Sequence, residues 1–169
     1  MDKVAAAARV SKTTVYQHFS DKDARFAAVI GLEAQEHTIA LTTGTDMDFA
    51  TKLHRVGLEA FDLLLSDINI AVFRTIAAEA ARTPSLGRSF REKGPAALIG
   101  LVAAFLDQAM QAGTLRPMDP TLAATHFLGL ITSDLQGRAL LGDPVVLTAQ
   151  DREHYLARGI EVFLGGYAA

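Results

Sequence analysis

The chain has 169 residues, half of them apolar and 21% charged, and a formal net charge of −3 at pH 7. This composition is typical of a soluble globular protein and argues against a disordered chain. Cysteine is absent, which excludes structural disulfides and zinc sites with thiolate ligands. The longest apolar stretch, residues 96–106, is too short to cross a membrane. The first residues lack the layout of a secretory signal, so we expect a cytoplasmic protein.

The N-terminal segment is mildly basic, with five basic and three acidic side chains in residues 1–25, whereas the rest of the chain has eleven basic and sixteen acidic side chains. A basic end on an acidic chain is what a small DNA-contacting segment needs, because phosphate attraction acts locally.

Alternating strand patterns are absent and alanine and leucine recur at helical spacing, so we expect an all-α fold. Two short helices are predicted over residues 2–8 and 12–19, with Ser11 as the N-cap of the second. A short helix, a tight turn and a second short helix together predict a helix-turn-helix.

The second of these helices has two different faces. Val15 and Phe19 are four residues apart and are expected to pack inward, while Thr13 and Gln17 lie on the opposite face. Hydroxyl and amide groups suit base edges, and phenol, imidazole and amino groups suit phosphates. We therefore expect DNA contacts from eight residues: Ser11, Lys12, Thr13, Thr14, Tyr16, Gln17, His18 and Lys22. A plain polar helix followed by a capped loop is the less favoured interpretation.

The remaining elements are also predicted to be helices. A third helix begins after Ser20 and ends near Thr42, and Asp46 is expected to cap the next. Glycine and proline predict later helix boundaries: one helix is expected to end at Gly113, and another is expected to begin with Pro84 at its first position. Besides the helix that begins at Pro84, the later helices are expected to cover residues 49–65, 70–82, 96–112, 120–141 and about 148–164.

Residues 4–23 resemble the DNA-binding signature of TetR-family transcription regulators. The stretch VAAAARVSKTTVYQHFSDKD follows the family pattern I-A-x-x-A-G-V-S-x-x-x-[LV]-Y-x-[HY]-F-x-x-K-[ED]. The remainder is similar, more loosely, to the ligand domain of the AefR-like subset. The segments that carry this second resemblance are Phe73-Arg74 through Glu79, Thr83-Pro84, Gly113-Thr114-Leu115 and Phe163-Leu164-Gly165-Gly166-Tyr167.

The resemblance implies a repressor that binds double-stranded operator DNA and is released by a small molecule. Because the predicted pocket is apolar, we expect a hydrophobic or aromatic effector. In such a protein Thr13, Thr14 and Gln17 would face bases, while Tyr16, His18 and Lys22 would hold the phosphate backbone. Residues 1–43 would form the DNA-binding head with its connecting helix, and residues 44–169 the ligand-binding and dimerisation domain. The homodimer would form through residues 120–141 and 148–164.

The chain departs from the family pattern in two places. Arg9 stands where the family has a turn glycine, and a side chain there costs about 1–2 kcal/mol if the position needs a positive φ. The family's first helix has no counterpart before Asp2, which leaves truncation, a mis-assigned start and a genuine loss as explanations. The alternative function is therefore a headless dimer that binds a small molecule or blocks a full-length relative.

An effector pocket is expected among the middle helices, and the residues expected to line it are Phe61, Leu65, Phe73, Phe105 and His126. For any single phenylalanine an ordinary core position is the favoured interpretation, and for His126 a polar contact at the dimer seam. Glu33 and His37 have the i, i+4 spacing of metal ligands, but a surface ion pair is favoured over a metal site. No phosphate loop, nucleophile elbow or paired-histidine motif is found, so we expect no enzyme activity and no cofactor.

Overall fold

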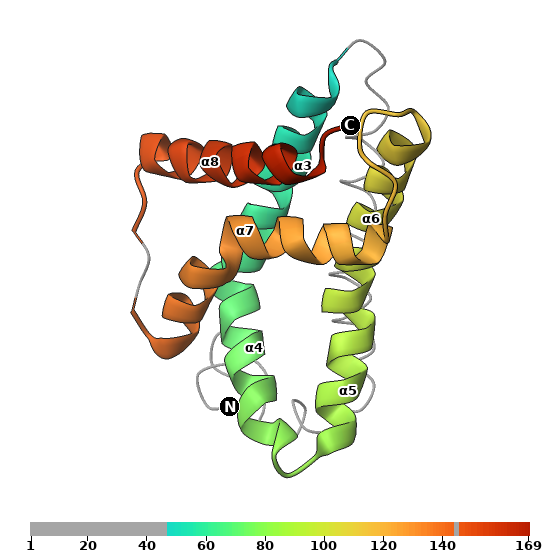
Figure 1. Cartoon of the computed structure of the whole chain (residues 1–169). Helices are drawn as coiled ribbons and strands as arrows, with labels where there is room; N and C mark the ends of the chain where they lie inside the picture. The colour runs from blue at the N-terminus through green and yellow to red at the C-terminus, as the bar shows by residue number, and fades with distance from the viewer. Residues whose placement is uncertain (1–46, 144–145) are drawn as a thin grey trace.

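The computed structural model describes residues 47–143 and 146–169, and the regular structure in these ranges is helical. The elements are α3 (Phe49–Leu65), α4 (Asp67–Ala80), α5 (Pro84–Lys93), α6 (Pro95–Gln111), α7 (Pro120–Leu141) and α8 (Ala149–Tyr167), shown in Figure 1. The all-α expectation is therefore confirmed. The predicted helix-turn-helix and its eight DNA contacts lie outside the described residues, as do Glu33 and His37.

Helices α3, α6, α7 and α8 form a four-helix body around the main core. Phe127 of α7 and Phe163 of α8 are fully buried and meet edge to face, with ring centroids 5.2 Å apart. Burying one such side chain stabilises the fold by about 1.5–3 kcal/mol. Glycines let the helices approach closely, because a Cβ on Gly57 would lie 2.8 Å from Leu156 Cδ1. The same core also holds Leu53, Val102, Leu106, Ile131 and Leu156.

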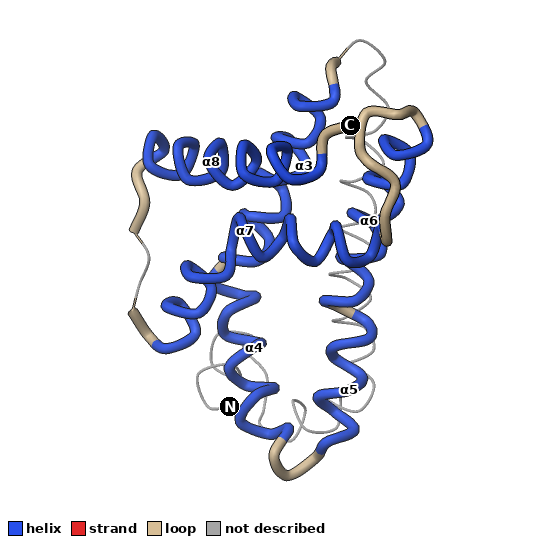
Figure 2. The backbone as a smooth tube through the Cα atoms, in the orientation of Figure 1, coloured by secondary structure: helices blue, strands red, loops and turns tan. Residues whose placement is uncertain are grey.

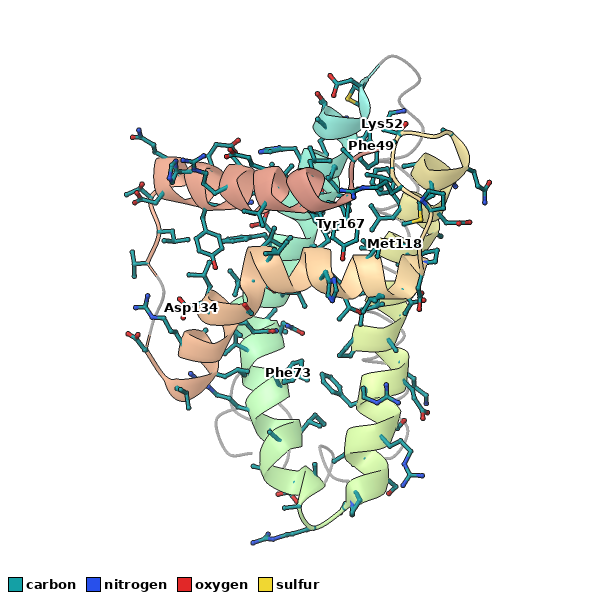
Figure 3. All side chains as sticks on the ribbon, viewed as in Figure 1. Phe49, Lys52, Phe73, Met118, Asp134 and Tyr167 are labelled. Carbon is teal, nitrogen blue, oxygen red and sulfur yellow. The ribbon has the colours of Figure 1, made fainter. Side chains whose placement is uncertain are left out.

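Helices α4 and α5 form an arm that extends away from this body and closes in a tight turn, as Figures 1 and 2 show. Phe73 of α4 is directed toward α5 in Figure 3 and meets Phe90 edge to face, with ring centroids 5.1 Å apart. Helix α5 has no buried residue. The arm is therefore held mainly by its own aromatic pair and by its attachment to the body.

Local capping explains where most helices begin. The carboxylate of Asp48 accepts a hydrogen bond from the Thr51 amide at 2.8 Å, so Asp48 rather than Asp46 caps α3. Ser66 caps α4 in the same way, which starts that helix at Asp67, three residues before the predicted start. The last helix, α8, begins with a reciprocal capping pair, in which the side chains of Thr148 and Asp151 each accept a hydrogen bond from the other's backbone amide.

Glycine marks two of the predicted helix ends. Gly113 and Gly142 adopt positive φ values of 74° and 90°, which favour glycine. Gly142 follows α7 directly, and Gly113 follows Ala112, the C-cap of α6. Three ends differ from prediction: α4 stops at Ala80 instead of residue 82, α6 stops at Gln111 instead of residue 112, and α8 continues to Tyr167 instead of residue 164. Within the described ranges, none of the helices is long and apolar enough to span a membrane.

Candidate functional site

Two of the five residues predicted to line an effector pocket, Phe61 and Leu65, line one open cleft, and the other three do not belong to the lining of that cleft. Phe105 is buried in the main core and stacks on Phe49, with ring centroids 5.5 Å apart. Phe73 lies within the arm, and His126 is exposed on α7. Only Phe61 and Leu65 lie together, on the last turns of α3, where they line an open cleft. As ligand contacts, all five remain predictions.

The cleft lies where the end of α3 and the start of α4 meet the end of α7 and the start of α8. Its volume is about 800 Å³, within the range of roughly 300–1,000 Å³ typical of small-molecule sites. Apolar side chains contribute part of the wall and charged side chains the rest. Besides Phe61 and Leu65, the lining comprises Asp62, Ser66, Asp67, Ile70, Ala71, Arg74, Ala139, Gly142, Val146, Leu147 and Arg152.

Arg152 of α8 covers one side of this cleft. Its guanidinium lies over the Phe61 ring, 5.4 Å from the centroid, and its Nη2 is 2.7 Å from Asp62 Oδ2. The Nε atom is shielded from solvent and has no hydrogen-bond partner among the described residues. Tyr155 meets Phe61 edge to face, and burial, with a smaller effect from Asp134, raises the pKa of the Tyr155 phenol.

Arg74 of α4 forms a second cationic wall and connects the arm to α7. Its Nε donates to the Leu140 carbonyl oxygen at 2.9 Å, and its Nη2 donates to the Ala139 carbonyl oxygen. These two carbonyls belong to the last turn of α7, where helical hydrogen-bond acceptors are left free and the helix dipole favours a cation. Arg74 therefore completes the end of α7 while facing the cleft.

Sequence reasoning missed both arginines as site residues, although one left a signal. Arg152 is four residues before Leu156 and eight before Ile160, both buried, so it occupies the inner face of an amphipathic helix. A charged residue at such a position is uncommon unless it has a partner. Arg74 left no comparable local signal, because its acceptors lie 65 and 66 residues further along the chain.

A second candidate surface is the outer face of α7 and α8, which points away from the core and is not covered by the other described helices. Leu122 and Val162 are 46% and 61% exposed, large values for apolar side chains. A Cβ added to Gly129, Gly137 or Gly165 would meet nothing within 4 Å, so these helix positions face open space. His126 on the same side of α7 is hydrogen-bonded to Tyr167 at the end of α8; Tyr167 is labelled in Figure 3. This polar contact forms within one chain.

Comparison with known families identifies both parts of the chain. Residues 51–169 match the family described as AefR-like transcriptional repressor, C-terminal domain, and residues 1–29 match the bacterial regulatory proteins of the tetR family. No curated protein sequence matches the chain at a significant level.

Solved structures of the same family match nearly the whole chain. The flavonoid-responsive regulator FrrA is 33% identical, with a TM-score of 0.70 over 99% of this chain and 86% of its own. A TetR-family regulator from Mesorhizobium loti is 25% identical, with a TM-score of 0.77 over 99% and 86%. A TetR regulator from Agrobacterium tumefaciens is 28% identical, with a TM-score of 0.66 over 98% and 81%. The chain therefore belongs to the TetR family of DNA-binding transcriptional regulators, which are not enzymes.

Proposed function

We propose that this chain is a homodimeric repressor that acts in the cytoplasm and leaves its operator when a small hydrophobic or aromatic effector binds. The observation that carries the proposal is the match of residues 51–169 to the C-terminal domain of AefR-like repressors. In the proposed division, residues 1–43 form the DNA-binding head with its connecting helix and residues 44–169 the ligand and dimer domain. An effector acts in this scheme by preferring the conformation that fits the operator poorly.

The effector class is supported by the relative named for its response to flavonoids, which is 33% identical over almost the entire chain. Flavonoids contain aromatic rings, and the described part of this chain contains a cleft with Phe61 in its wall. We propose an aromatic effector on these two grounds.

The dimer is proposed to form through residues 120–141 and 148–164. The outer face of α7 and α8 combines exposed apolar residues, such as Leu122 and Val162, with glycines that face open space. Small residues allow two helices from different subunits to approach closely, and apolar side chains lose contact with water when the subunits associate. Dimers of helix-turn-helix proteins hold two heads against successive half-sites of the operator.

The test measures fluorescence anisotropy of a labelled duplex from the DNA flanking the gene, at about 50 and 200 mM salt. We expect nanomolar binding with a steep salt dependence. Leu122→Arg should sediment as a monomer and bind this duplex roughly 100-fold more weakly, because a single head lacks the effective concentration of a linked pair. Ile68→Arg is the matched control, since Ile68 is an equally apolar, 69% exposed residue on α4.

Two outcomes would contradict the proposal. A well-folded dimer without measurable duplex binding would exclude the repressor and support the headless alternative, a ligand-binding dimer that blocks a full-length relative. A Leu122→Arg variant that remains dimeric would show that the subunits associate through another surface.

A further inference from the structure

We propose that the cleft between α3, α4, α7 and α8 binds an aromatic ligand that carries a single acidic oxygen group, such as a carboxylate. The inference deepens the proposed function, because it assigns a ligand class and a place to the effector. Its physical basis is independent of DNA binding. The cleft volume of about 800 Å³ is ample for a ligand of two or three rings.

A cation stacked on an aromatic ring forms the α8 wall of the cleft. Phe61 is only 4% exposed, and the Arg152 guanidinium lies over its ring, 5.4 Å from the centroid, so Arg152 is the group that a ligand meets first. One hydrogen-bond donor of Arg152, the Nε group, has no acceptor among the described residues. A buried donor without an acceptor is unfavourable, and an acidic oxygen on the ligand would satisfy it after a small turn of the side chain.

The second cation faces the same space from α4. Arg74 uses its Nε and Nη2 groups for the carbonyls of Leu140 and Ala139, which leaves further N–H groups of its five for a ligand. Apolar side chains complete this wall, namely Leu65, Ile70, Val146 and Leu147.

The acidic side chains of the cleft limit the charge that a ligand can carry. Asp62 is paired with Arg152, and Asp67 lies in the first turn of α4, where the helix dipole favours a negative charge. The two arginines and the two carboxylates give the lining no net formal charge. A single acidic group can lie beside the arginines, whereas a second negative charge adds repulsion from both carboxylates. The cleft therefore favours a monoanionic aromatic compound over a neutral one and over a phosphorylated one.

Ligand binding in the cleft can also affect α7, one of the two helices of the proposed dimer interface. An acidic group that draws Arg74 into the cleft competes with the hydrogen bonds to the last turn of α7. The contact between the arm and α7 would then weaken. This consequence rests on the proposed function, in which α7 belongs to the dimer interface.

The test uses two fluorescent probes with the same rings. One is 1-anilinonaphthalene-8-sulfonate, which carries a single negative charge, and the other is N-phenyl-1-naphthylamine, which is neutral. Each probe is titrated against the full chain in the absence of DNA. We expect the sulfonate to bind about tenfold more tightly than the neutral probe, because only the sulfonate makes charge-assisted hydrogen bonds.

Two pairs of variants locate the bound probe. Ala71→Trp fills the cleft from an exposed position of α4 and should weaken both probes at least tenfold, while Ala78→Trp, two turns further along the same helix, should not. Arg152→Gln should weaken only the sulfonate, about tenfold, whereas Arg158→Gln removes the same charge from an exposed position of α8 outside the cleft and should change neither.

Equal affinities of the two probes, or sulfonate binding that is the same in Ala71→Trp and Ala78→Trp, would overturn the inference. Failure of the proposed function gives a different result. A chain that binds the sulfonate in the cleft but never binds operator DNA contradicts the repressor proposal and supports the cleft as a ligand site.

Discussion

The four-helix body and the α4–α5 arm differ in how they are held. In the body, α7 alone buries seven residues, among them Phe127 and Ile131. In the arm, α4 buries three and α5 none. Segments with few buried apolar contacts open at lower free energy than a packed core. The body is therefore the rigid part of this domain, and the arm is the part that a bound molecule can move.

The largest difference in the free energy of unfolding is expected when one phenylalanine in each region is replaced by alanine. Phe127→Ala should lower the free energy of unfolding by about 3–5 kcal/mol, because the fully buried ring leaves a cavity in the body. Phe73→Ala should lower it by only about 1–2 kcal/mol, since this ring is half-buried and loses mainly its contact with Phe90. Urea denaturation followed by circular dichroism measures both values. Equal losses would show that the arm is as tightly packed as the body.

The arrangement of helices was largely predictable because its signals are local. Residues 49–65 and 120–141 were predicted with the bounds that the structure shows. Pro84 at a first helical position and Gly142 after the last one act through their own backbone conformation. The start of α4 was missed since Ser66 caps the helix three residues earlier than the apolar spacing indicated.

The candidate cleft could not be predicted, because it depends on packing between distant segments. Phe61, Arg74, Ala139 and Arg152 come from four different helices, and only the angles between those helices bring them together. Apolar spacing selected Phe105 as readily as Phe61, and both side chains are buried, but only Phe61 reaches the wall of the cleft. Periodicity shows which residues face inward and cannot distinguish a filled interior from a pocket wall. The DNA contacts, from Ser11 to Lys22, stay predictions.

A smaller effect is expected from adding one methyl group at a close helix contact in each region. A Cβ on Gly159 would lie 2.9 Å from Ile131 Cγ2 in the body, and one on Gly87 would lie 3.0 Å from the Ala80 Cβ in the arm. Alanine gains about 0.5–1 kcal/mol over glycine in a helix. In Gly159→Ala we expect a net loss of about 1 kcal/mol or more, because Ile131 is fully buried and cannot move away.

The matching arm variant should behave in the opposite way. In Gly87→Ala we expect a stability within about 0.5 kcal/mol of the wild type or slightly above it, because α5 can shift and the helix propensity improves. Thermal unfolding of the two variants under one buffer condition is the measurement. A loss in Gly87→Ala as large as that in Gly159→Ala would show that α5 is fixed against α4 as firmly as α8 is fixed against α7.

The smallest effect is expected in the pH dependence of stability, because the N-cap of α3 in the body can titrate and the N-cap of α4 in the arm cannot. Asp48 caps α3 of the body, and hydrogen bonds from the Thr51 backbone and hydroxyl lower the pKa of its carboxyl from 3.8. A lowered pKa in the folded state means that the stabilisation is present above pH 3.8 and is lost as the pH falls through the folded value. Ser66, which caps α4 of the arm, does not titrate.

Replacing the acidic cap by the type of cap found in the arm isolates this effect. Asp48→Ser keeps a side-chain acceptor for the α3 amides and removes the titrating group. We expect its Tm to equal that of the wild type within a few degrees at neutral pH, and to fall less steeply than that of the wild type below pH 3.8. Parallel Tm curves for the two proteins across the acid range would contradict the assigned role of Asp48, because the cap would then contribute nothing that depends on its ionisation.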